Sequence, residues 1–459
     1  MALKSFHGGV HPPEYKELTE DKALEVMPLS AELYVPLGQH LGKPADPLVK
    51  KGAYVRRGEK LAESSGFISA PIHSPAAGKF VKMVKGPVVG GTTADLLVIR
   101  PGEPEPPKEG EEAEPIDVSP VVLPPYHLET VTAEQIIERV REAGIVGQGG
   151  AAFPTAVKLS PPPDKPIDWM IINAAECEPY LTADDRLMQE EPARVVSGFQ
   201  ALQKVLGAKD AVIGIEENKP EAIAAMEKAA AKAKGVRVAH LHVKYPQGGE
   251  KQLIDAILGR EVPTGGLPMD CGVVVQNVAT CAAVDDAVRF GKPLISRVTT
   301  VTGEGVTTPV NVVGRMGTPV QAFIDAADGF RGTPGRVILG GPMMGGAIHN
   351  TEIPVIKSTG GVLVLTPEQL PSGEFESCIR CGRCVRACPI HLCPNDMGNY
   401  SEVEMWGELE GLDVNDCIEC GCCAYSCPAN RPLVQFFRYA KLWARQQAAL
   451  AKAAESKDN

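Results

Sequence analysis

Cysteine is the residue type with the clearest capacity for chemistry in this sequence, and its spacing is regular near the carboxyl end. Segments 378–389 and 417–428 both read Cys-x2-Cys-x2-Cys-x3-Cys-Pro. Thiolates at this spacing are typical ligands of iron–sulfur cubanes, and the fourth cysteine of each run binds the cluster of the other run. The pattern therefore predicts two [4Fe–4S] clusters and one-electron chemistry.

The same rule divides the cysteines of the two runs into two ligand sets. Cluster 1 is assigned to Cys378, Cys381, Cys384 and Cys427. Cluster 2 is assigned to Cys417, Cys420, Cys423 and Cys388. A pair of structural zinc sites is the alternative, because Cys-x2-Cys also binds zinc, but two intact copies with both prolines favour clusters. The remaining cysteines are Cys393 and Cys422, which are surplus to the spacing, and Cys177, Cys271 and Cys281, which we expect to pack as small hydrophobic residues.

Clusters exchange single electrons, whereas most soluble reductants exchange hydride, so the sequence should also hold a flavin that converts one into the other. The candidate site is the glycine-rich segment 144–158. Its backbone N–H groups could cradle a phosphate, and Lys158 could add a positive charge. The segment does not meet the ordinary dinucleotide fingerprint, because a helix precedes it and Pro154 interrupts the residues after it. A plain glycine-rich connector is therefore the alternative.

Polar residues come directly after a short apolar run, 168–172, that is typical of a buried strand. The next segment, 173–180, reads Asn-Ala-Ala-Glu-Cys-Glu-Pro-Tyr. Ligands of open α/β sheets bind at the carboxyl ends of strands, so these side chains are candidate ligand contacts. A surface turn with two solvated glutamates is the alternative. Segments 245–251 and 276–280 carry similar polar residues and are modest candidates by themselves.

Composition is that of an ordinary globular protein and excludes some functions. The 459 residues suggest about three domains. Lys plus Arg total 46 and Asp plus Glu 57, and the net charge of −11 argues against non-specific nucleic-acid binding. No apolar stretch reaches the roughly 18 residues that a membrane span needs. We expect a cytoplasmic protein, in which closely spaced cysteines would not persist as disulfides.

Composition shifts along the chain indicate a multidomain protein of mixed α/β and α+β class. Residues 1–100 resemble a barrel sandwich of the biotinyl/lipoyl type, and the absence of a lysine between Lys60 and Lys79 favours a scaffold role over a carrier role. The other predicted segments are a Pro- and Glu-rich linker (101–128), an α/β domain (129–290), a small α+β module (291–365), the two-cluster ferredoxin-like domain (366–431) and a C-terminal helix (432–459).

Alternating helices and strands in segment 129–290 predict a largely parallel, Rossmann-like sheet. The predicted elements are helices 133–143, 192–206 and 220–233 and strands 168–172 and 211–215. Thr132 is the predicted N-cap of the first helix. The C-terminal helix has basic residues and an aromatic face that could touch anionic lipid, but we favour packing against its own domain or a partner subunit.

The order of these segments resembles the flavoprotein NADH-binding subunit of respiratory complex I. The shared features are Gly-Gln-Gly-Gly-Ala-Ala-Phe-Pro-Thr (147–155), Asn173 to Pro179, Gly249-Glu250 and Asn277 to Thr280. The barrel sandwich, the opening Gly-Gly-Val-His-Pro-Pro (8–13) and both cysteine runs extend the likeness. With them, nearly the whole chain resembles the C subunits of the Rnf complex, a membrane-associated ferredoxin:NAD⁺ oxidoreductase.

The resemblance implies FMN over the 147–158 loop, with NAD(H) as the substrate stacked on it. The cofactor contacts that it implies are Gly147, Gly149, Gly150, Phe153, Lys158, Asn173, Glu176, Gly249, Glu250, Asn277 and Thr280. Glu178 and Lys158 are implied as the catalytic residues, and Glu178 and Phe153 as contacts of NAD(H). The 291–365 module would be a soluble-ligand-binding β-grasp domain.

The expected function is that of a peripheral subunit at the cytoplasmic face of the membrane, which passes electrons between the clusters, FMN and NAD(H). Its partners would be the other membrane and iron–sulfur subunits, and ferredoxin either directly or through a partner subunit. Three positions depart from the complex I pattern, because Ala175, Cys177 and Lys251 stand where Asp, Ser and a second Glu are usual. Two alternatives stay open: an NADH-dependent cobalamin reductase of bacterial microcompartments and an electron-wire subunit without flavin.

Overall fold

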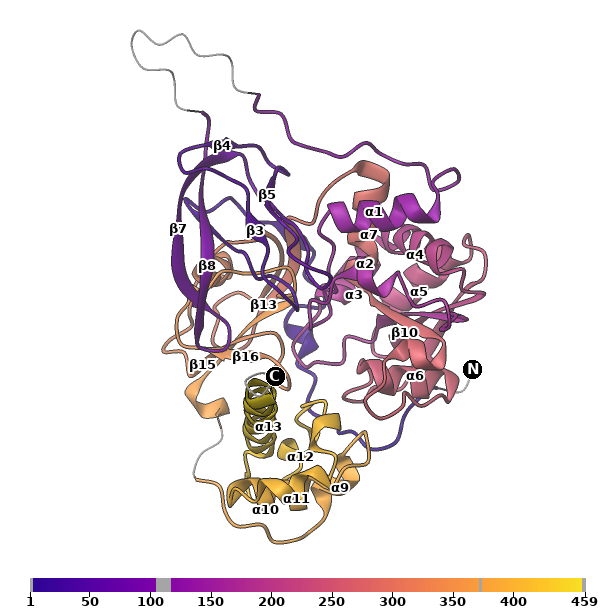
Figure 1. Ribbon diagram of the computed structural model, residues 1–459, viewed down its shortest axis with the longest axis vertical. Helices are drawn as coiled ribbons and strands as arrows, with labels where there is room; N and C mark the ends of the chain where they lie inside the picture. Colours follow the sequence, from indigo (N-terminus) through magenta and orange to yellow (C-terminus); the bar gives the residue numbers. More distant parts are fainter. Residues whose placement is uncertain (1–2, 105–116, 371–373, 456–459) are drawn as a thin grey trace.

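The computed structural model describes residues 3–104, 117–370 and 374–455 (Figure 1). Much of the predicted linker, 105–116, lies outside the described residues. The described part of the linker is hydrogen-bonded to the α/β domain. The N–H of Leu123 donates to the carbonyl of Gly291, and the N–H of Tyr126 donates to the carbonyl of Val288. Both side chains pack against the core of the α/β domain.

Two antiparallel sheets near the amino end pack face to face as a sandwich. Their orders are β2-β8-β7-β4 and β3-β5-β6. The strands are β2 (Leu33–Pro36), β3 (Asp46–Pro47), β4 (Tyr54–Val55), β5 (Lys60–Glu63), β6 (Ile72–His73), β7 (Gly78–Val88) and β8 (Thr92–Pro101). Leu33 of β2, Leu61 of β5 and Leu97 of β8 meet in one buried core, so side chains from both sheets form it. This arrangement is a barrel sandwich.

The α/β domain is built on a four-stranded parallel sheet in the order β11-β10-β9-β12. Its strands are β9 (Trp169–Ala174), β10 (Asp210–Glu216), β11 (Val236–Leu241) and β12 (Val273–Asn277). The chain adds β10 and β11 on one side of β9 and then places β12 on the other side. The crevice between β9 and β12 is therefore the topological switch point, where sheets of this kind bind ligands.

Helices cover both faces of this sheet (Figure 1). They are α1 (Ala133–Glu142), α2 (Thr155–Lys158), α3 (Ala183–Glu190), α4 (Pro192–Leu206), α5 (Pro220–Ala230), α6 (Glu250–Leu258) and α7 (Val278–Phe290), with the short 3-10 helix η2 at Pro268–Cys271. The predicted helix 192–206 is confirmed by α4, and Thr132 caps α1 through a reciprocal capping box with Gln135. The predicted helix 220–233 ends earlier, at Ala230.

A six-stranded sheet comes next, in the order β1-β14-β13-β17-β15-β16. Its strands are β1 (Leu24–Val26), β13 (Ser296–Thr302), β14 (Val310–Arg315), β15 (Arg336–Leu339), β16 (Gly346–Ile348) and β17 (Gly361–Leu365), with helix α8 (Val320–Ala326) and 3-10 helix η3 (Pro367–Gln369). Strand β1 pairs in parallel with β14 although it falls within the predicted first segment, 1–100. That segment therefore contributes to two structural units, which the three-residue length of β1 could not reveal.

The cysteine-rich domain at the carboxyl end is helical. It contains α9 (Arg383–Ala387), α10 (Pro394–Glu402), α11 (Trp406–Glu410), η4 (Val414–Asp416), α12 (Cys422–Tyr425) and α13 (Leu433–Glu455). Leu433 and Phe437 of α13 are buried in the core of this domain, which confirms packing for the start of the C-terminal helix. Among the described residues, no helix has both the length and the hydropathy required to cross a bilayer.

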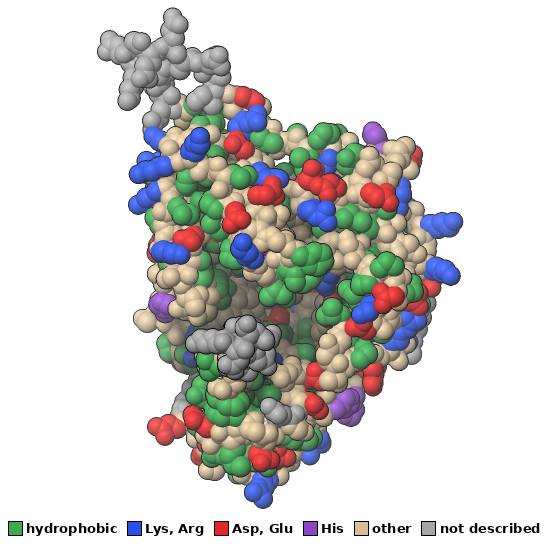
Figure 2. All heavy atoms as spheres, in the orientation of Figure 1, with side chains coloured by type: hydrophobic (Ala, Val, Ile, Leu, Met, Phe, Trp, Pro, Cys, Tyr) green, Lys and Arg blue, Asp and Glu red, His purple; other side chains and the backbone are tan. Residues whose placement is uncertain are grey.

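The amino-terminal segment joins the domains before the barrel sandwich begins. The N–H of Gly9 donates to the carbonyl of Ala387, and Val10 and Tyr245 exchange backbone hydrogen bonds. The 3-10 helix η1 (Lys16–Leu18) comes after these contacts. Figure 2 shows the viewed face hollowed near its centre, between the barrel sandwich and the α/β domain, with hydrophobic side chains along the hollow.

Candidate functional site

Two asparagines lie side by side at the switch point of the parallel sheet. Asn173 of β9 and Asn277 of β12 are partners in register. Asn277 caps α7, because its Oδ1 accepts from the N–H groups of Ala279 (2.9 Å) and Thr280 (3.3 Å). Its Nδ2 donates to Oδ2 of Asp184 at 2.5 Å. The cap fixes this side chain at the expected cofactor crevice.

The glycine-rich loop is anchored to the same helix through Gln148. The backbone N–H of Gln148 donates to Oγ1 of Thr280 at 2.9 Å, and its side-chain Nε2 donates to the carbonyl of Ala279 at 2.9 Å. The carbonyl of Gln148 accepts from Nη2 of Arg297 at 2.9 Å. These hydrogen bonds therefore hold the loop in a defined conformation against α7.

The glycines after Gln148 leave main chain at the surface. Gly149 and Gly150 are exposed, and a Cβ on Gly149 would lie 3.0 Å from the Cβ of Asn277. The loop closes where the N–H of Gly147 donates to the carbonyl of Phe153 at 2.8 Å. Glycine thus permits close approach of the loop to the capping asparagine and keeps polar backbone groups open to a ligand.

Lys158 lies at the end of α2 and faces the carboxyl end of β12. Its Nζ forms an ion pair with Oε1 of Glu250 at 2.8 Å and donates to the carbonyl of Val275 at 3.2 Å. Glu250 begins α6, and Gly249 is the N-cap position of that helix. Lys158 and Glu250, which were both predicted to contact the cofactor, are therefore in direct contact with each other. An anionic ligand at Lys158 would compete with the Glu250 carboxylate.

Glu176 is a helix cap and not a solvated residue of a turn. Its backbone is left-handed, with φ 46°. Its two carboxylate oxygens accept from the N–H groups of Asp184 (2.7 Å) and Asp185 (3.0 Å) at the start of α3. Burial raises the pKa of Glu176 to about 7, while Lys16 opposes that rise in pKa.

Glu178 points to a different element from Glu176. Its carboxylate accepts from the N–H groups of Met343 (3.0 Å) and Met344 (2.8 Å), in the turn after β15. Burial raises the pKa of Glu178 to about 7, although these two hydrogen bonds lower it. The surface-turn alternative for the two glutamates is therefore wrong, because both carboxylates are bonded to main chain.

Lys16 holds the segment between the two glutamates. Its buried Nζ donates to the carbonyls of Glu176 (2.9 Å), Glu178 (3.1 Å) and Leu181 (2.6 Å). Burial lowers the pKa of Lys16, and the nearby Lys219 lowers that pKa further. No local pattern marks Lys16, because its acceptors are about 160 residues away.

Asn173 connects the crevice to the cysteine-rich domain. Its Nδ2 donates to the carbonyl of Gly248 at 2.6 Å, and the N–H of Gly248 donates to Sγ of Cys177 at 3.2 Å. Three residues earlier, the hydroxyl of Tyr245 donates to the carbonyl of Cys420 at 2.8 Å. One short segment, 245–248, thus contacts both the end of β9 and the second cysteine run.

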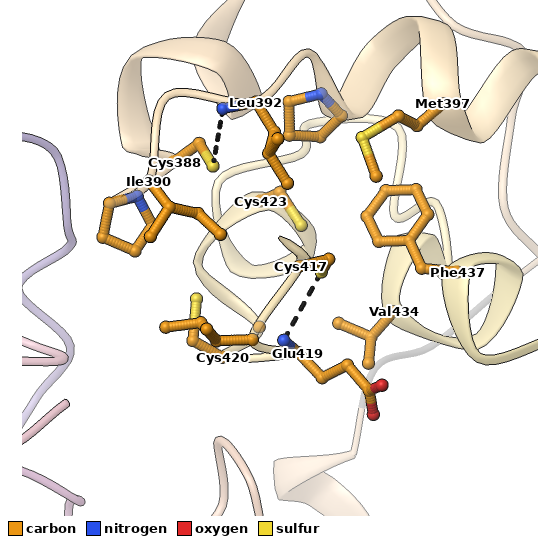
Figure 3. A pocket seen from close by; sticks show the side chains of 14 residues that line it. Cys388, Ile390, Leu392, Met397, Cys417, Glu419, Cys420, Cys423, Val434 and Phe437 are labelled. Carbon is orange, nitrogen blue, oxygen red and sulfur yellow. Dashed lines mark hydrogen bonds between the residues drawn. The ribbon is translucent and has the colours of Figure 1, made fainter. Parts of the chain in front are cut away.

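The four cysteines assigned to cluster 2 line one pocket (Figure 3). These cysteines are Cys388, Cys417, Cys420 and Cys423. The pocket has a volume of about 330 Å³, which includes the open space at its mouth. Apolar side chains, Met397 among them, complete the wall. Backbone N–H groups already point at two of the sulfurs, since Glu419 donates to Cys417 at 3.4 Å and Leu392 to Cys388 at 3.3 Å. Donors of this kind tune cluster potentials.

The cysteines assigned to cluster 1 lie closer to the surface. Cys384 is buried, and Cys381 is exposed. Burial raises the pKa of Cys384, and the neighbouring Cys427 and Cys378 raise it further. The N–H of Arg380 donates to Sγ of Cys378 at 3.4 Å. Within the described ranges, no three His, Cys, Asp or Glu side chains converge closely enough to hold a single metal ion.

The two cysteine runs follow the same backbone path. Left-handed φ angles recur at equivalent positions: Arg380 (56°) and Glu419 (57°), Gly382 (70°) and Gly421 (83°), and His391 (60°) and Asn430 (49°). Each run then forms a short helix, α9 in the first and α12 in the second. The repeat in sequence is therefore also a repeat in structure.

The cysteines outside the two ligand sets lie in different environments. Cys281 is buried in the core of the α/β domain, and the partly buried Cys177 and Cys271 pack against other hydrophobic clusters, so all three pack as small hydrophobic residues, as predicted. Of the surplus pair, Cys393 is exposed and Cys422 is fully buried beside Tyr245.

Polar atoms without a described partner remain around the glycine-rich loop and on the neighbouring strand β12. They are Oδ1 of Asp184, Nε and Nη1 of Arg297 and Nε2 of Gln276, all buried. With the open amides of the loop and the charge of Lys158, they supply both donors and acceptors. This set fits a nucleotide that carries a phosphate and a polar ring. Sequence reasoning missed Asp184 and Arg297, which no local pattern marks, and it quoted Gln148 within the 147–155 motif without giving it a role.

Three family profiles match the chain. The profile described as an RnfC barrel sandwich hybrid domain matches residues 4–103. The Nuo51 FMN-binding domain matches residues 140–286, and a 4Fe-4S dicluster domain matches residues 371–435. Together they support a multidomain α/β protein with a barrel sandwich, an FMN-binding domain and an iron–sulfur domain, as predicted.

Curated relatives extend over almost the whole chain. The C subunit of a proton-translocating ferredoxin:NAD(+) oxidoreductase complex from Clostridium ljungdahlii is 46% identical over 96% of this chain and 94% of its own length. A Na(+)-translocating counterpart from Acetobacterium woodii is 45% identical over 95% of this chain and 96% of its own length. Among solved structures, an NAD+-reducing [NiFe]-hydrogenase in the H2-reduced state superposes with a TM-score of 0.48 at 20% identity, covering 70% of this chain and 66% of that chain. The chain therefore belongs to the family of C subunits of ion-translocating ferredoxin:NAD(+) oxidoreductase complexes.

Proposed function

We propose that this protein is the peripheral subunit that exchanges electrons between NAD(H) and the rest of an ion-translocating ferredoxin:NAD⁺ oxidoreductase, at the cytoplasmic face of the membrane. The observation that carries the proposal is segment 245–248. It contacts Asn173 in the flavin crevice through Gly248 and the cluster 2 run through Tyr245. The two proposed redox sites would thereby be joined by two hydrogen bonds and the four residues 245–248.

Residues of the crevice fit FMN. The amides of Gly149 and Gly150 and the Nζ of Lys158 would hold its phosphate, and Asn173 and Asn277 would face its polar groups. Bound FMN would supply the exchange between hydride and single electrons. Gly147, Phe153, Glu176, Gly249, Glu250 and Thr280 complete the proposed set of contacts.

The substrate side of the crevice is assigned to Phe153, Lys158 and Glu178. Phe153 would offer an aromatic face to the nicotinamide end of NAD(H), and Lys158 would attract its phosphates once Glu250 is displaced. Glu178 holds the 343–344 turn through both carboxylate oxygens. Its pKa of about 7, raised by burial, leaves its charge responsive to neutral pH and to a bound anion.

Two [4Fe–4S] clusters are proposed, with the ligand sets predicted from spacing. The cluster 2 cysteines already line one pocket, and Cys378 and Cys427 neighbour Cys384. Such clusters supply one-electron capacity. Because Tyr245 contacts the Cys420 run, cluster 2 would be nearer to the flavin and cluster 1 farther from it.

Finer assignments of fold and partners belong to the same proposal. We assign 129–290 as a Rossmann-like domain and 291–365 as a β-grasp domain of the soluble-ligand-binding type, between the barrel sandwich (1–100) and the two-cluster domain (366–431). The partners would be the other subunits of the complex and ferredoxin, directly or through one of them. Nucleic acid has no role in it.

Cofactor content tests the proposal. The full chain, purified anaerobically, should contain about eight iron atoms and about eight acid-labile sulfides, the content of two [4Fe–4S] clusters, and about one FMN. Cys423→Ala should lower the iron content by about half, and Cys281→Ala, a buried cysteine outside both sets, is the control. A preparation with zinc and no iron, or one without flavin, would contradict the proposal.

A further inference from the structure

One loop of the barrel sandwich extends to the glycine-rich loop of the α/β domain. It connects β5 to β6 and reads Ser-Ser-Gly-Phe-Ile-Ser-Ala-Pro (64–71). It lies against the earlier segment 40–44, since the N–H of Lys43 donates to the carbonyl of Ile68 at 3.1 Å. We name residues 40–44 and 64–71 together the barrel tip. Because the loop 64–71 contains no lysine that could carry a prosthetic group, another role has to account for it.

Two buried serines hold the barrel tip in a defined conformation. The hydroxyl of Ser65 donates to the carbonyl of Pro44 at 2.6 Å, and the hydroxyl of Ser69 donates to the carbonyl of Lys43 at 2.9 Å. The backbone N–H of Ser65 also donates to Oγ of Ser69 at 3.0 Å. The three residues between these serines, 66–68, are therefore presented at the end of a well-fixed loop.

The barrel tip is also bound to the glycine-rich segment 144–158 at two points. At the first point, the N–H of Leu41 donates to the carbonyl of Ala152 at 3.2 Å. Ala152 has a left-handed backbone with φ 52°, a conformation that persists in a non-glycine residue only where the surroundings hold it. At the second point, Nζ of Lys357 donates to the carbonyls of Pro71 (2.9 Å) and Gly144 (2.7 Å). The barrel tip and the glycine-rich loop therefore form one continuous structure.

Apolar side chains of the barrel tip stay in solvent although its main chain is fixed. Ala70 is buried in the same core as Ala152. Three residues before Ala70, Phe67 is 80% exposed, and Leu41 (54%) and Ile68 (37%) are exposed on the same tip. The Phe67 ring contributes little to folding, because most of its area remains in water. Hydrophobic side chains also border the hollow between the barrel sandwich and the α/β domain (Figure 2). The apolar surface of the tip is therefore open to a ligand.

We propose that the barrel tip binds the adenine of NAD(H), with Phe67 as the stacking surface and Leu41 and Ile68 as its apolar border. This inference rests on the proposed function. The nicotinamide has to lie in the crevice beside the flavin, whereas the adenosine half takes no part in hydride transfer and extends out of the crevice. Ala152 precedes Phe153, a proposed contact of NAD(H), so the tip adjoins the substrate side of the crevice. Adenine has a flat aromatic face, and such faces stack on aromatic side chains.

The position and the size of this surface favour a nucleotide over a partner protein. A stable protein interface buries about 800 Å² on each partner, more than three side chains on two short segments supply. A site for a small molecule, by contrast, needs a few apolar and aromatic side chains beside polar groups that fix the orientation of the ligand. The open amides of the glycine-rich loop are such polar groups. A partner protein that covers the barrel tip is the competing outcome of the experiment below.

The test measures binding of ADP-ribose, which has the adenosine half and both phosphates of NAD(H) but no nicotinamide. Calorimetry compares the FMN-loaded full chain with its Phe67→Ala, Phe67→Tyr and Met83→Ala variants. Phe67→Ala should bind about 5- to 150-fold more weakly, the loss expected when a base loses its aromatic stacking partner. Phe67→Tyr keeps the ring and should bind as the unaltered chain does. Met83→Ala is the matched control and should leave the affinity unchanged. Met83 is 50% exposed on β7, a strand that Figure 1 shows on the side of the sandwich away from α2.

Reduced nicotinamide mononucleotide separates adenine binding from the reaction at the flavin. It can donate hydride but has no adenine, so its rate of reducing bound FMN, measured by anaerobic stopped flow, should be the same in Phe67→Ala and in the unaltered chain. NADH should instead require a higher concentration in Phe67→Ala to reach the same limiting rate of flavin reduction.

Equal affinity for ADP-ribose in the unaltered chain and in Phe67→Ala would overturn the proposal and leave the barrel tip to a partner protein. An equal loss of rate with reduced nicotinamide mononucleotide would also overturn it, because Phe67 would then act on the crevice itself. Flavin that neither NADH nor the mononucleotide reduces in the unaltered chain would contradict the proposed function, while the ADP-ribose series would still decide the adenine site.

Discussion

The hydroxyl of Tyr245 donates to the main-chain oxygen of Cys420 at 2.8 Å, across the boundary between the α/β domain and the cysteine-rich domain. Tyr245 is only 2% exposed and packs against Cys422 and Val10. This contact fixes the α/β domain against the second cysteine run. It is also the most direct basis for placing cluster 2 next to the flavin crevice.

Tyr245→Phe should lower the reduction potential of cluster 2. The substitution removes one donor to a carbonyl beside a ligating cysteine and keeps the ring that fills the boundary. The expected shift is at most about 40 mV, the one-electron equivalent of about 1 kcal/mol for one hydrogen bond. A redox titration followed by electron paramagnetic resonance measures it. An unchanged potential would mean that this hydrogen bond does not tune the cluster.

Substitution of one cysteine ligand should have different effects on electron transfer in the cluster 1 set and in the cluster 2 set. Cys384→Ala should remove cluster 1 and slow turnover with ferredoxin at least about tenfold, with NADH-to-dye activity at the flavin retained. Cys423→Ala should remove cluster 2 and interrupt transfer between the flavin and cluster 1. Iron content, checked with both assays, reports which cluster is lost. Equal loss of NADH-to-dye activity in Cys384→Ala would contradict this order of cofactors.

Lys357 provides a prediction about stability and pH, because it joins three parts of the fold. Its Nζ donates to the carbonyls of Pro71 (2.9 Å) and Gly144 (2.7 Å), from the segment that precedes β17. Burial lowers the pKa of Lys357 to about 7 from 10.5. Between these two values the unfolded chain binds more protons than the folded chain, so folding stability gained from this group rises with pH.

Lys357→Met should remove that dependence. The stability of the unaltered chain relative to Lys357→Met should increase from about pH 7 to about pH 9. Thermal unfolding of both proteins across this range gives the difference. Lys234→Met, at an exposed lysine, should show no such trend. A difference that is constant with pH would show that the pKa of Lys357 is not lowered in the folded chain.

Lys158→Met should weaken FMN retention. Loss of one charge-assisted contact to a phosphate costs about 1.5–3 kcal/mol, roughly 10- to 150-fold in affinity. Glu250→Gln should instead strengthen FMN binding, because it frees Lys158 from its 2.8 Å ion pair. Dissociation constants come from fluorescence titration of the flavin-depleted chain. Tighter binding in Lys158→Met would show that this lysine does not face the cofactor.

Asn277→Ala should destabilise the start of α7 and the crevice together. Removing an N-cap side chain typically costs about 1 kcal/mol, and here the contact with Asp184 is lost as well. Denaturant unfolding measures the stability change. Asn277→Asp, which can still cap the helix, should recover the stability but bring a carboxylate against Asp184. Full stability in Asn277→Ala would contradict the capping role.

Local patterns predicted the parts of the fold that depend on local physics. The helical period of 192–206 and the capping residue Thr132 specify elements that form where expected. The spacing of the cysteines also reflects a local rule, because each run turns back on itself at Gly382 and Gly421. The cluster 2 set was therefore predictable, and its members line one pocket.

Long-range contacts could not be predicted in this way. Strand β1 pairs with β14 across nearly 290 residues, and three residues are too few to mark a partner. The segment 173–180 was recognised, but the direction of Glu178 toward Met343 depends on how two domains pack. Tyr245 carried no signal of its contact with Cys420. The contacts of FMN and NAD(H) stay predictions, since they depend on side-chain positions that no spacing rule fixes.

The most direct test of the central claim is an anaerobic titration of the full chain with NADH, in which the absorbance of flavin and clusters is followed together. We predict that the clusters bleach along with the flavin, and that in Cys423→Ala NADH reduces the flavin while the remaining cluster stays oxidised. Flavin that is reduced by NADH while both clusters of the unaltered chain remain oxidised would contradict electron transfer along the Tyr245 boundary.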